Sequence, residues 1–269
     1  MFKPYGMSGF WRRMMFTFFA FFNLPYSRES NKKDILTFFQ KLWPYNSGHK
    51  LIRCAHYLIP NDLVKIDAVF SPGVGQSSDF EYDFAERGIK CFLADASVKG
   101  PCKPHKNFKF LKKFIASKTS GNFISLDDWT HEFYPKGKDA ILQMDIESYE
   151  FESLLLAQEE TLKKFRIIVL ELHCLNVANT QEGLLLLTLT MDKILRHFNV
   201  SHFHVNNGVH PLIFKGLKFP GVIELTFLRK DRCLSHTSVK DLPHRLDVTS
   251  FPNKSDPVFY SKFLGGVIK

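Results

Sequence analysis

Paired cysteines are missing from this sequence of 269 residues. It has five cysteines, none in a Cys-x-x-Cys pair, at scattered positions: Cys54, Cys91, Cys102, Cys174 and Cys233. An odd number at such spacings argues against a disulfide framework and against a zinc site built from cysteine pairs. We therefore expect reduced thiols in a cytoplasmic protein.

The sequence also lacks an apolar run long enough to span a bilayer as a helix. An apolar run at residues 14–22 follows Arg12 and Arg13. No small-x-small cleavage motif accompanies it, which argues against a signal peptide. Two interpretations stay open: a helix packed on the domain, or an interfacial membrane helix with a basic flank. We favour the packed helix, and the second interpretation leaves room for weak peripheral membrane association through residues 11–24.

Acidic residues are too few to balance the basic ones, and the formal net charge is +9. A positive balance favours acidic partners such as phosphorylated sugars, nucleic acid or an anionic membrane, or it reflects a solvated basic surface; the expected substrate is a small molecule or a glycan, which an acidic group would suit. No arginine-rich tract and no nucleic-acid-binding module is present, so no nucleic-acid partner is expected. Internal repeats and low-complexity segments are absent too.

The pattern along the chain predicts one α/β domain with two extensions. Residues 1–62 are expected to be a mostly helical N-terminal extension, 63–235 the main domain, and 236–269 an extended tail. Strands are predicted at 65–70, 90–97, 108–116, 139–147, 166–173, 201–207 and 222–230, and helices at 31–43, 78–88, 149–165 and 180–198. Alternation of strands with helices indicates crossovers and a mostly parallel, doubly wound sheet. The last two strands have no long helix between them, which favours an antiparallel pairing at one edge.

A Ser-Pro-Gly-Val-Gly turn at residues 71–75 follows the first predicted strand and precedes a helix. Asp95 lies 20 residues beyond Gly75, at the end of the next strand. That position faces ribose hydroxyls in doubly wound folds. The third glycine of a G-x-G-x-x-G motif is replaced by Ser78, so S-adenosylmethionine fits better than a nicotinamide dinucleotide; an ordinary β-turn is the other interpretation. The residues expected to bind the cofactor are Ser71, Gly73, Gly75, Asp95 and Ser97.

Polar side chains mark the ends of the later strands. Asp145 ends an apolar strand, and Glu171 and His173 lie two apart, so they share a face. The same rule places His202, His204 and Asn206 on one face. Glu147 and Glu150 are assigned to the start of the following helix, where acidic groups are favoured. We expect Asp145 and His173 to be catalytic, with Asp145, Glu171, His173 and His204 as candidate ligands for Mg²⁺ or Mn²⁺.

Several segments in order across residues 56–247 resemble the FkbM-like S-adenosylmethionine-dependent methyltransferases, in particular a bacterial branch with a Ser-Pro-Gly-Val turn. The segments are "HYLIPNDL", "FSPGVGQSSDFEYDFAERGIKCFLADASV", "SLDDW", "LQMDIESYEFESLL", "FRIIVLELH", "HFHVNN", "IELTFLRKDR" and "LPHRLD". The chain departs from the family pattern at Ala55-His56, at Ser148-Tyr149 and at Val205. Ser148-Tyr149 replaces a small pair beside the expected active centre.

The resemblance implies a class I methyltransferase-like (Rossmann-like) fold and methyl transfer from S-adenosylmethionine to an oxygen nucleophile. The implied acceptor is a hydroxyl on a sugar, a glycan or a secondary metabolite. The enzyme would align the reacting atoms and remove a proton from that hydroxyl, with Asp145 or His173 as the base. The competing hypothesis is a non-catalytic protein that binds S-adenosylmethionine or a glycan and retains only the fold.

Overall fold

The computed structural model describes residues 28–75, 77–134, 136–137, 139–240, 242–249, 251 and 253–254. The apolar and basic segment 11–24 and the end of the predicted tail lie outside these residues. Within them, no helix combines the length and the apolar character that a membrane span requires.

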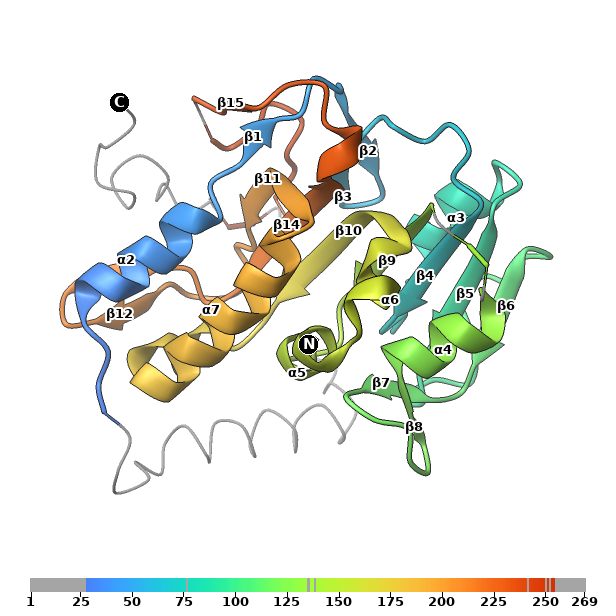
Figure 1. Ribbon diagram of the computed structural model, residues 1–269, viewed down its shortest axis with the longest axis horizontal. Helices are drawn as coiled ribbons and strands as arrows, with labels where there is room; N and C mark the ends of the chain where they lie inside the picture. Colours follow the sequence, from blue (N-terminus) through green and yellow to red (C-terminus); the bar gives the residue numbers. More distant parts are fainter. Residues whose placement is uncertain are drawn as a thin grey trace.

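A seven-stranded sheet forms the centre of the domain, in the order β11-β14-β10-β9-β4-β5-β6 (Figure 1). Its strands are β4 (Ala68–Pro72), β5 (Lys90–Ala94), β6 (Phe108–Leu111), β9 (Ala140–Met144), β10 (Phe165–Leu172), β11 (Phe198–Val205) and β14 (Ile223–Arg229). Strands β6, β5, β4, β9 and β10 run parallel, and β14 is antiparallel to both β10 and β11. The predicted mostly parallel, doubly wound α/β sheet is confirmed.

Helices cover both faces because the central strands are apolar on both sides. The helices are α2 (Lys32–Lys41), α3 (Asp79–Ala85), α4 (Leu126–Phe133), α5 (Glu150–Leu156), α6 (Glu159–Lys163) and α7 (Gln181–Leu195). One face packs Phe70 and Leu142 into the larger core with α2, α4, α5 and α7. The other packs Val69 and Ile141 against α3 and a hairpin at residues 51–60. The alternation of neighbouring residues between the two cores follows the strand period of two.

The prediction that residues 1–62 are mostly helical is wrong for residues 45–60. Helix α2 is present, and the Asn31 side chain caps its start by accepting from the backbone N–H of Asp34 at 2.9 Å. Beyond it lie three short strands: β1 (Tyr45–Asn46), β2 (Leu51–Cys54) and β3 (Tyr57–Pro60). A two-residue turn at Ala55 and His56, with Ala55 at φ 50°, closes β2 and β3 into a hairpin.

Two other predicted elements are interrupted. The strand predicted at 108–116 breaks after Leu111: β6 stays in the central sheet, whereas β7 (Phe114–Ala116) pairs with β8 (Phe123–Ser125). The helix predicted at 149–165 breaks into α5 and α6. At that break the Lys193 ammonium donates to the Leu155 carbonyl at 2.6 Å and to the Ala157 carbonyl, which satisfies the end of α5.

The last connections complete the fold. Two short strands, β12 (Leu212–Phe214) and β13 (Leu217–Phe219), form a hairpin. A short 3₁₀ helix spans Leu175–Asn179. A 3₁₀ turn at Lys230–Arg232 leads to β15 (Thr237–Ser238), which pairs with β1. The described part of the tail then lies against the domain. Its Asp247 forms a buried ion pair with His202 of β11 at 2.8 Å.

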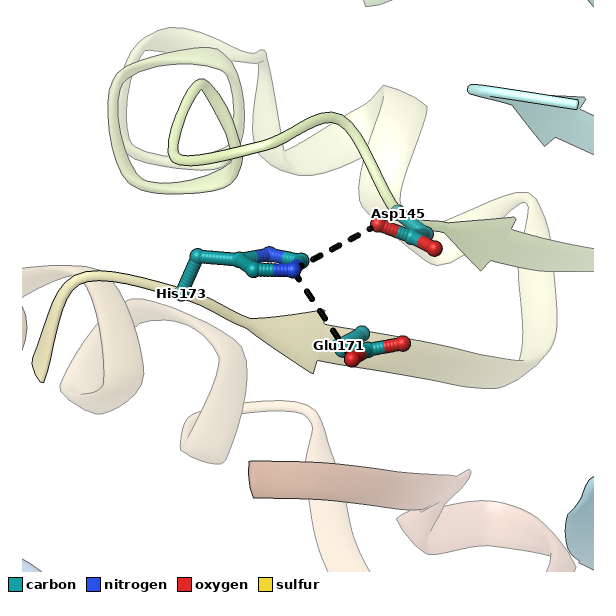
Figure 2. A group of neighbouring side chains, drawn as sticks. All are labelled: Asp145, Glu171 and His173. Carbon is teal, nitrogen blue, oxygen red and sulfur yellow. Dashed lines mark ion pairs between the residues drawn. The ribbon is translucent and has the colours of Figure 1, made fainter. Parts of the chain in front are cut away.

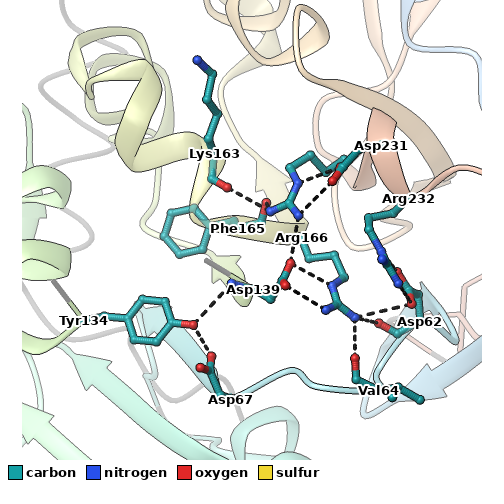
Figure 3. Close-up of polar contacts among 11 residues, drawn as sticks. Asp62, Val64, Asp67, Tyr134, Asp139, Lys163, Phe165, Arg166, Asp231 and Arg232 are labelled. Carbon is teal, nitrogen blue, oxygen red and sulfur yellow. Dashed lines mark hydrogen bonds and ion pairs between the residues drawn. The ribbon is translucent and has the colours of Figure 1, made fainter. Parts of the chain in front are cut away.

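A buried arginine network closes the amino-terminal edge of the sheet (Figure 3). The Arg166 side chain, 2% exposed, donates to the carbonyls of Asp62 at 2.9 Å and Val64 at 2.7 Å, and it pairs with Asp139 at 3.1 Å. Arg229 reaches Asp139 at 2.9 Å and Arg232 reaches Asp62 at 2.7 Å. Every guanidinium thus has carboxylate or carbonyl partners, which such buried charges require.

Candidate active site

The glycine turn lies where β4 ends, next to the first residue after β9. Gly73 has φ +87°, and a Cβ there would lie 1.7 Å from the Asp145 carbonyl oxygen. Gly75 has φ +55°, but the nearest heavy atom to a Cβ at that position is the Gly73 carbonyl oxygen at 3.9 Å. Gly73 is therefore required for a close backbone approach within the protein, whereas Gly75 faces open space in which a ligand could approach.

Asp95 holds this turn in place from the end of β5. One of its carboxylate oxygens accepts from the Gly75 N–H at 3.0 Å. The other accepts from the backbone N–H and the hydroxyl of Ser97 at 2.7 and 2.6 Å. The structure thus brings three of the expected cofactor-binding residues together. The oxygen facing Gly75 keeps room for one further donor, such as a ribose hydroxyl.

Ser71 is placed differently. Its fully buried hydroxyl donates to the side-chain oxygen of Gln143 at 2.6 Å and is hydrogen-bonded to the Glu81 carboxyl. Burial raises the pKa of Glu81, so a protonated Glu81 can donate to Ser71. The Ser71 hydroxyl therefore lies in the interior behind the turn, and it is not presented to a cofactor.

Asp145, Glu171 and His173 meet at the carboxyl ends of β9 and β10 (Figure 2). One potential ligand atom from each lies within 4.8 Å of the others. The His173 Nε2 atom is 3.8 Å from an Asp145 oxygen and 3.7 Å from a Glu171 oxygen. These residues converge because β9 and β10 are adjacent parallel strands, so their carboxyl ends lie at one edge. Asp145 and His173, the two residues expected to be catalytic, therefore lie close together.

Glu150 does more than begin helix α5. Its carboxylate is fully buried, lies 3.3 Å from His173 Nδ1 and accepts from the Ile146 N–H at 2.9 Å. Glu147 lies 3.9 Å from His173 Nε2. The sequence pattern predicts only a helix-start role for both acids. Spacing alone could not reveal the second role, since acidic residues are favoured in any first helical turn.

We define the acidic cluster as Asp145, Glu147, Glu150, Glu171 and His173; the pKa values of three members, Asp145, Glu171 and His173, are raised. Burial disfavours the imidazolium of His173, but the hydrogen bond and charge of Glu150, with Asp145 and Glu171, raise its pKa to about 10. Burial, and then the neighbouring carboxylates, raise the pKa of Asp145 well above its ordinary value. Burial and Glu224 likewise raise that of Glu171, against the opposing charge of His173. Several carboxylates therefore share one imidazolium, an excess of negative charge that a proton or a cation would relieve.

Three further residues support Glu171 directly or through a neighbour. Asn206 belongs to the strand face noted from the sequence, whereas nothing in the sequence points to Tyr57 or Gln143. The Asn206 amide donates to one Glu171 oxygen at 2.8 Å. The Tyr57 hydroxyl donates to the other at 3.5 Å and accepts from the Gln143 amide at 3.3 Å. Burial, followed by the charges of Asp145 and Glu171, raises the pKa of Tyr57, so it stays a neutral donor. The β2–β3 hairpin, which the sequence pattern predicts as helix, brings Tyr57 to Glu171.

His204 lies farther along the same row of the sheet. Glu224 of β14 is the register partner of both Glu171 on β10 and His204 on β11, so it lies between them. The Nδ1 atom of His204 is 3.1 Å from a Glu224 oxygen. The structure therefore places three of the four predicted metal ligands together and the fourth two strands away.

The loops around the cluster hold unusual backbone conformations. Glu147, Ser148 and Cys174 have φ values of 56°, 87° and 53°, in the left-handed region that favours glycine. The Ser148 hydroxyl donates to the Cys174 sulfur at 2.8 Å. Backbone strain of this kind persists where surrounding structure imposes it and is frequent at functional sites.

Comparison with known proteins finds only weak structural likenesses. No family model matches the chain, and no curated protein matches its sequence. A 16S rRNA (adenine(1408)-N(1))-methyltransferase from Catenulisporales acidiphilia is 10% identical, with a TM-score of 0.31 over 67% of this chain and 97% of that one. A 1,6-didemethyltoxoflavin-N1-methyltransferase from Burkholderia thailandensis is 14% identical, with a TM-score of 0.31 over 62% and 72% of the two chains. A structure described as converting a disulfide bond into a thioacetal group during echinomycin biosynthesis is 12% identical, with a TM-score of 0.30 over 69% and 84%. TM-scores this low do not support a transfer of function.

Proposed function

We propose that this protein transfers a methyl group from S-adenosylmethionine to a hydroxyl oxygen. The observation that carries the proposal is that the glycine turn and the acidic cluster are contiguous. Gly73 packs against the backbone of Asp145, so a ligand seated on the turn would extend directly to the cluster. The two meet between β4 and β9, where the chain order of the strands reverses, and open α/β sheets bind ligands at such a point.

The turn fits S-adenosylmethionine in two respects. The Asp95 carboxylate and the open space beside Gly75 suit a ribose with an adjacent backbone contact. The missing third glycine disfavours a pyrophosphate, which S-adenosylmethionine does not contain. When bound, S-adenosylmethionine supplies a methyl group already activated by its sulfonium.

Asp145 is the best-placed general base for the acceptor hydroxyl. His173, with a pKa of about 10, is an imidazolium at neutral pH and cannot take up a proton. The Asp145 side chain is 32% exposed, against 14% for Glu171 and 9% for His173, and its raised pKa brings it closer to neutral pH. A well-matched base contributes about 10²–10⁴-fold in rate. In this assignment His173 and Glu150 orient and charge-balance the Asp145 carboxylate.

A divalent cation also fits the cluster. Asp145, Glu171 and His173 offer two carboxylates and one imidazole within 4.8 Å, a donor set compatible with Mn²⁺ and, through the oxygens, with Mg²⁺. When bound, such a cation would act as a Lewis acid and lower the pKa of a nearby hydroxyl. Asn206 and Tyr57 would then hold the Glu171 carboxylate in position, as supporting hydrogen bonds do in metal sites.

The acceptor is proposed as a sugar, a glycan or a secondary metabolite, on the strength of the FkbM-like resemblance alone. That family assignment and a cytoplasmic location stay predictions. The competing proposal is a protein that binds the cofactor without turnover. It is motivated by Ser148, which holds a φ of 87° where the family pattern has a glycine beside the active centre.

Calorimetric titration with S-adenosylhomocysteine tests the cofactor assignment. We expect binding to the full chain, and a ligand at 100 times its Kd should stabilise the fold by about 2.7 kcal/mol. Asp95→Ala should weaken binding sharply. Asp192→Ala should not, because Asp192 lies on α7 in an exposed ion pair with Lys41. Binding of a nicotinamide dinucleotide in place of S-adenosylhomocysteine would refute the proposal.

A further inference from the structure

The segment at the β6 edge of the sheet has a one-sided charge that the proposed reaction does not use. Residues 96–126 contain seven lysines, no arginine and no acidic residue. The lysines are Lys99, Lys103, Lys106, Lys109, Lys112, Lys113 and Lys118. Figure 1 shows β6, around which most of them lie, at the edge opposite α2. We call these seven residues the lysine-rich edge.

Among the residues that the structure describes, most of these lysines form no ion pair. Lys103 pairs with Asp79 at 2.9 Å, and His105 of the same segment pairs with Glu86 at 3.3 Å. Within the part of the chain that the structure describes, the exposed side chains of Lys106, Lys109 and Lys112 have no carboxylate partner. Their charges are therefore available to an external anionic partner.

A surface cavity lies within this edge, between the amino ends of β5 and β6 and the end of α4. Its volume is about 360 Å³. Phe92, Phe108 and Phe133 contribute apolar surface to it, and Lys90, Lys106 and Lys109 contribute positive charge, with Glu132 as an acidic member. The Lys109 ammonium lies 4.0 Å from the centre of the Phe133 ring, which fixes one cation beside the cavity.

We propose that the lysine-rich edge docks the protein on an anionic lipid surface, with the cavity receiving an acidic headgroup. Lysine is a compact point charge on a flexible stem, which suits a diffuse negative surface better than the paired hydrogen bonds that arginine makes to individual phosphates. Clusters of four to eight basic residues are typical of binding to anionic lipids. This inference does not depend on the proposed methyl transfer.

Nucleic acid fits the same surface less well. Single strands bind where exposed aromatic rings stack on bases. Here Phe92 is buried, Phe108 and Phe110 pack against the core on the α3 side, and the Lys109 ammonium lies over the Phe133 ring, so these rings are not free for stacking. Of the two interpretations of residues 11–24, the less favoured interfacial helix would add a second membrane signal, and stable peripheral binding usually combines two signals.

Edge lysines have another common role, since they prevent unwanted strand pairing at the open side of a sheet. The two roles predict different behaviour. If the lysines serve only to protect β6, their neutralisation should promote association between copies of the protein and leave lipid binding unaffected. If they dock on lipid, neutralisation should weaken binding at unchanged oligomeric state.

Vesicle co-sedimentation of the full chain tests the proposal. We expect binding to vesicles of equal parts phosphatidylcholine and phosphatidylglycerol, falling with added salt, and little binding to phosphatidylcholine alone. At roughly fivefold per lysine, the triple variant K106Q/K109Q/K112Q should bind about a hundredfold more weakly. The control K32Q/K33Q/K50Q removes the same charge from exposed positions on α2 and before β2, and it should bind nearly as the parent does.

Equal loss in both triple variants would overturn the proposal, because binding would then follow net charge alone. Unchanged binding in K106Q/K109Q/K112Q would overturn it as well, and would leave any lipid affinity to other residues. A parallel titration with homopolymeric RNA covers the nucleic-acid alternative. RNA binding that the edge variant abolishes, without vesicle binding by the parent, would replace a lipid partner with a nucleic acid. Circular dichroism of both variants checks that each is folded.

Discussion

The protonation of His173 gives the sharpest test of the site's electrostatics, and Glu150→Gln is the perturbation. Glutamine keeps the shape of Glu150 and an oxygen for the Ile146 N–H, but it removes the charge 3.3 Å from His173 Nδ1. Two unit charges about 4 Å apart interact by about 4 kcal/mol at an effective dielectric constant near 20. That corresponds to about three pKa units. Since Asp145 and Glu171 stay in place, we expect the pKa of His173 to fall from about 10 by one to three units, roughly.

Long-range ¹H–¹⁵N NMR of the imidazole, titrated across pH, measures this pKa directly. Glu152→Gln on the same helix is the matched control, because Glu152 is exposed and should leave His173 unchanged. The sign also appears in stability. The folded-state pKa of His173 lies above its ordinary 6.5, so its contribution is fully present below about pH 6.5 and is lost as pH rises through about 10. That contribution is at most about 5 kcal/mol, and Glu150→Gln should reduce it. A His173 pKa that does not move in Glu150→Gln would refute the reasoning.

Three other predictions address strain, the buried network and the cation. Ser148→Gly should relieve a residue held at φ 87° and raise the melting temperature by about 2–4 °C, roughly 1 kcal/mol, in calorimetry; a lower melting temperature would show that its hydroxyl matters more than its backbone. Arg166→Met should lower the free energy of unfolding in urea by about 3–5 kcal/mol, because Asp62 and Asp139 lose a buried partner; a loss under about 1 kcal/mol would contradict this. Mn²⁺ affinity, followed by electron paramagnetic resonance, should rise with pH because the cation displaces protons from His173 and Asp145, and Asp145→Asn should abolish it; affinity independent of pH would place Mn²⁺ elsewhere.

Strand ends were the part of the site that the sequence could predict. Asp145 follows a five-residue buried strand, and Glu171 and His173 lie on the same face at the end of another, so a parallel sheet must bring them to one edge. The glycine turn and Asp95 follow from the same strand–turn–helix logic. Roles that depend on tertiary packing could not be predicted from the sequence. An example is the Glu150 side chain, which lies against His173.

The misread segments have local causes. Short apolar runs such as 51–54 and 57–60 do not distinguish helix from strand, so the hairpin that brings Tyr57 to Glu171 was predicted as helix. Ser71 is a polar residue beside a glycine turn, yet strand parity points its hydroxyl into the core toward Glu81 and Gln143. In both cases the outcome depends on which element covers the sheet, and that information is not local.

A crystal structure of the protein with S-adenosylhomocysteine and Mn²⁺ tests most directly whether the glycine turn and the acidic cluster form one methyl-transfer site. We predict that the ribose hydroxyls bind Asp95 and that the sulfur atom faces Asp145. The anomalous signal of Mn²⁺ should lie among Asp145, Glu171 and His173. Density for the ligand away from the Gly73–Gly75 turn, or a sulfur atom directed away from the acidic cluster, would contradict the proposed function.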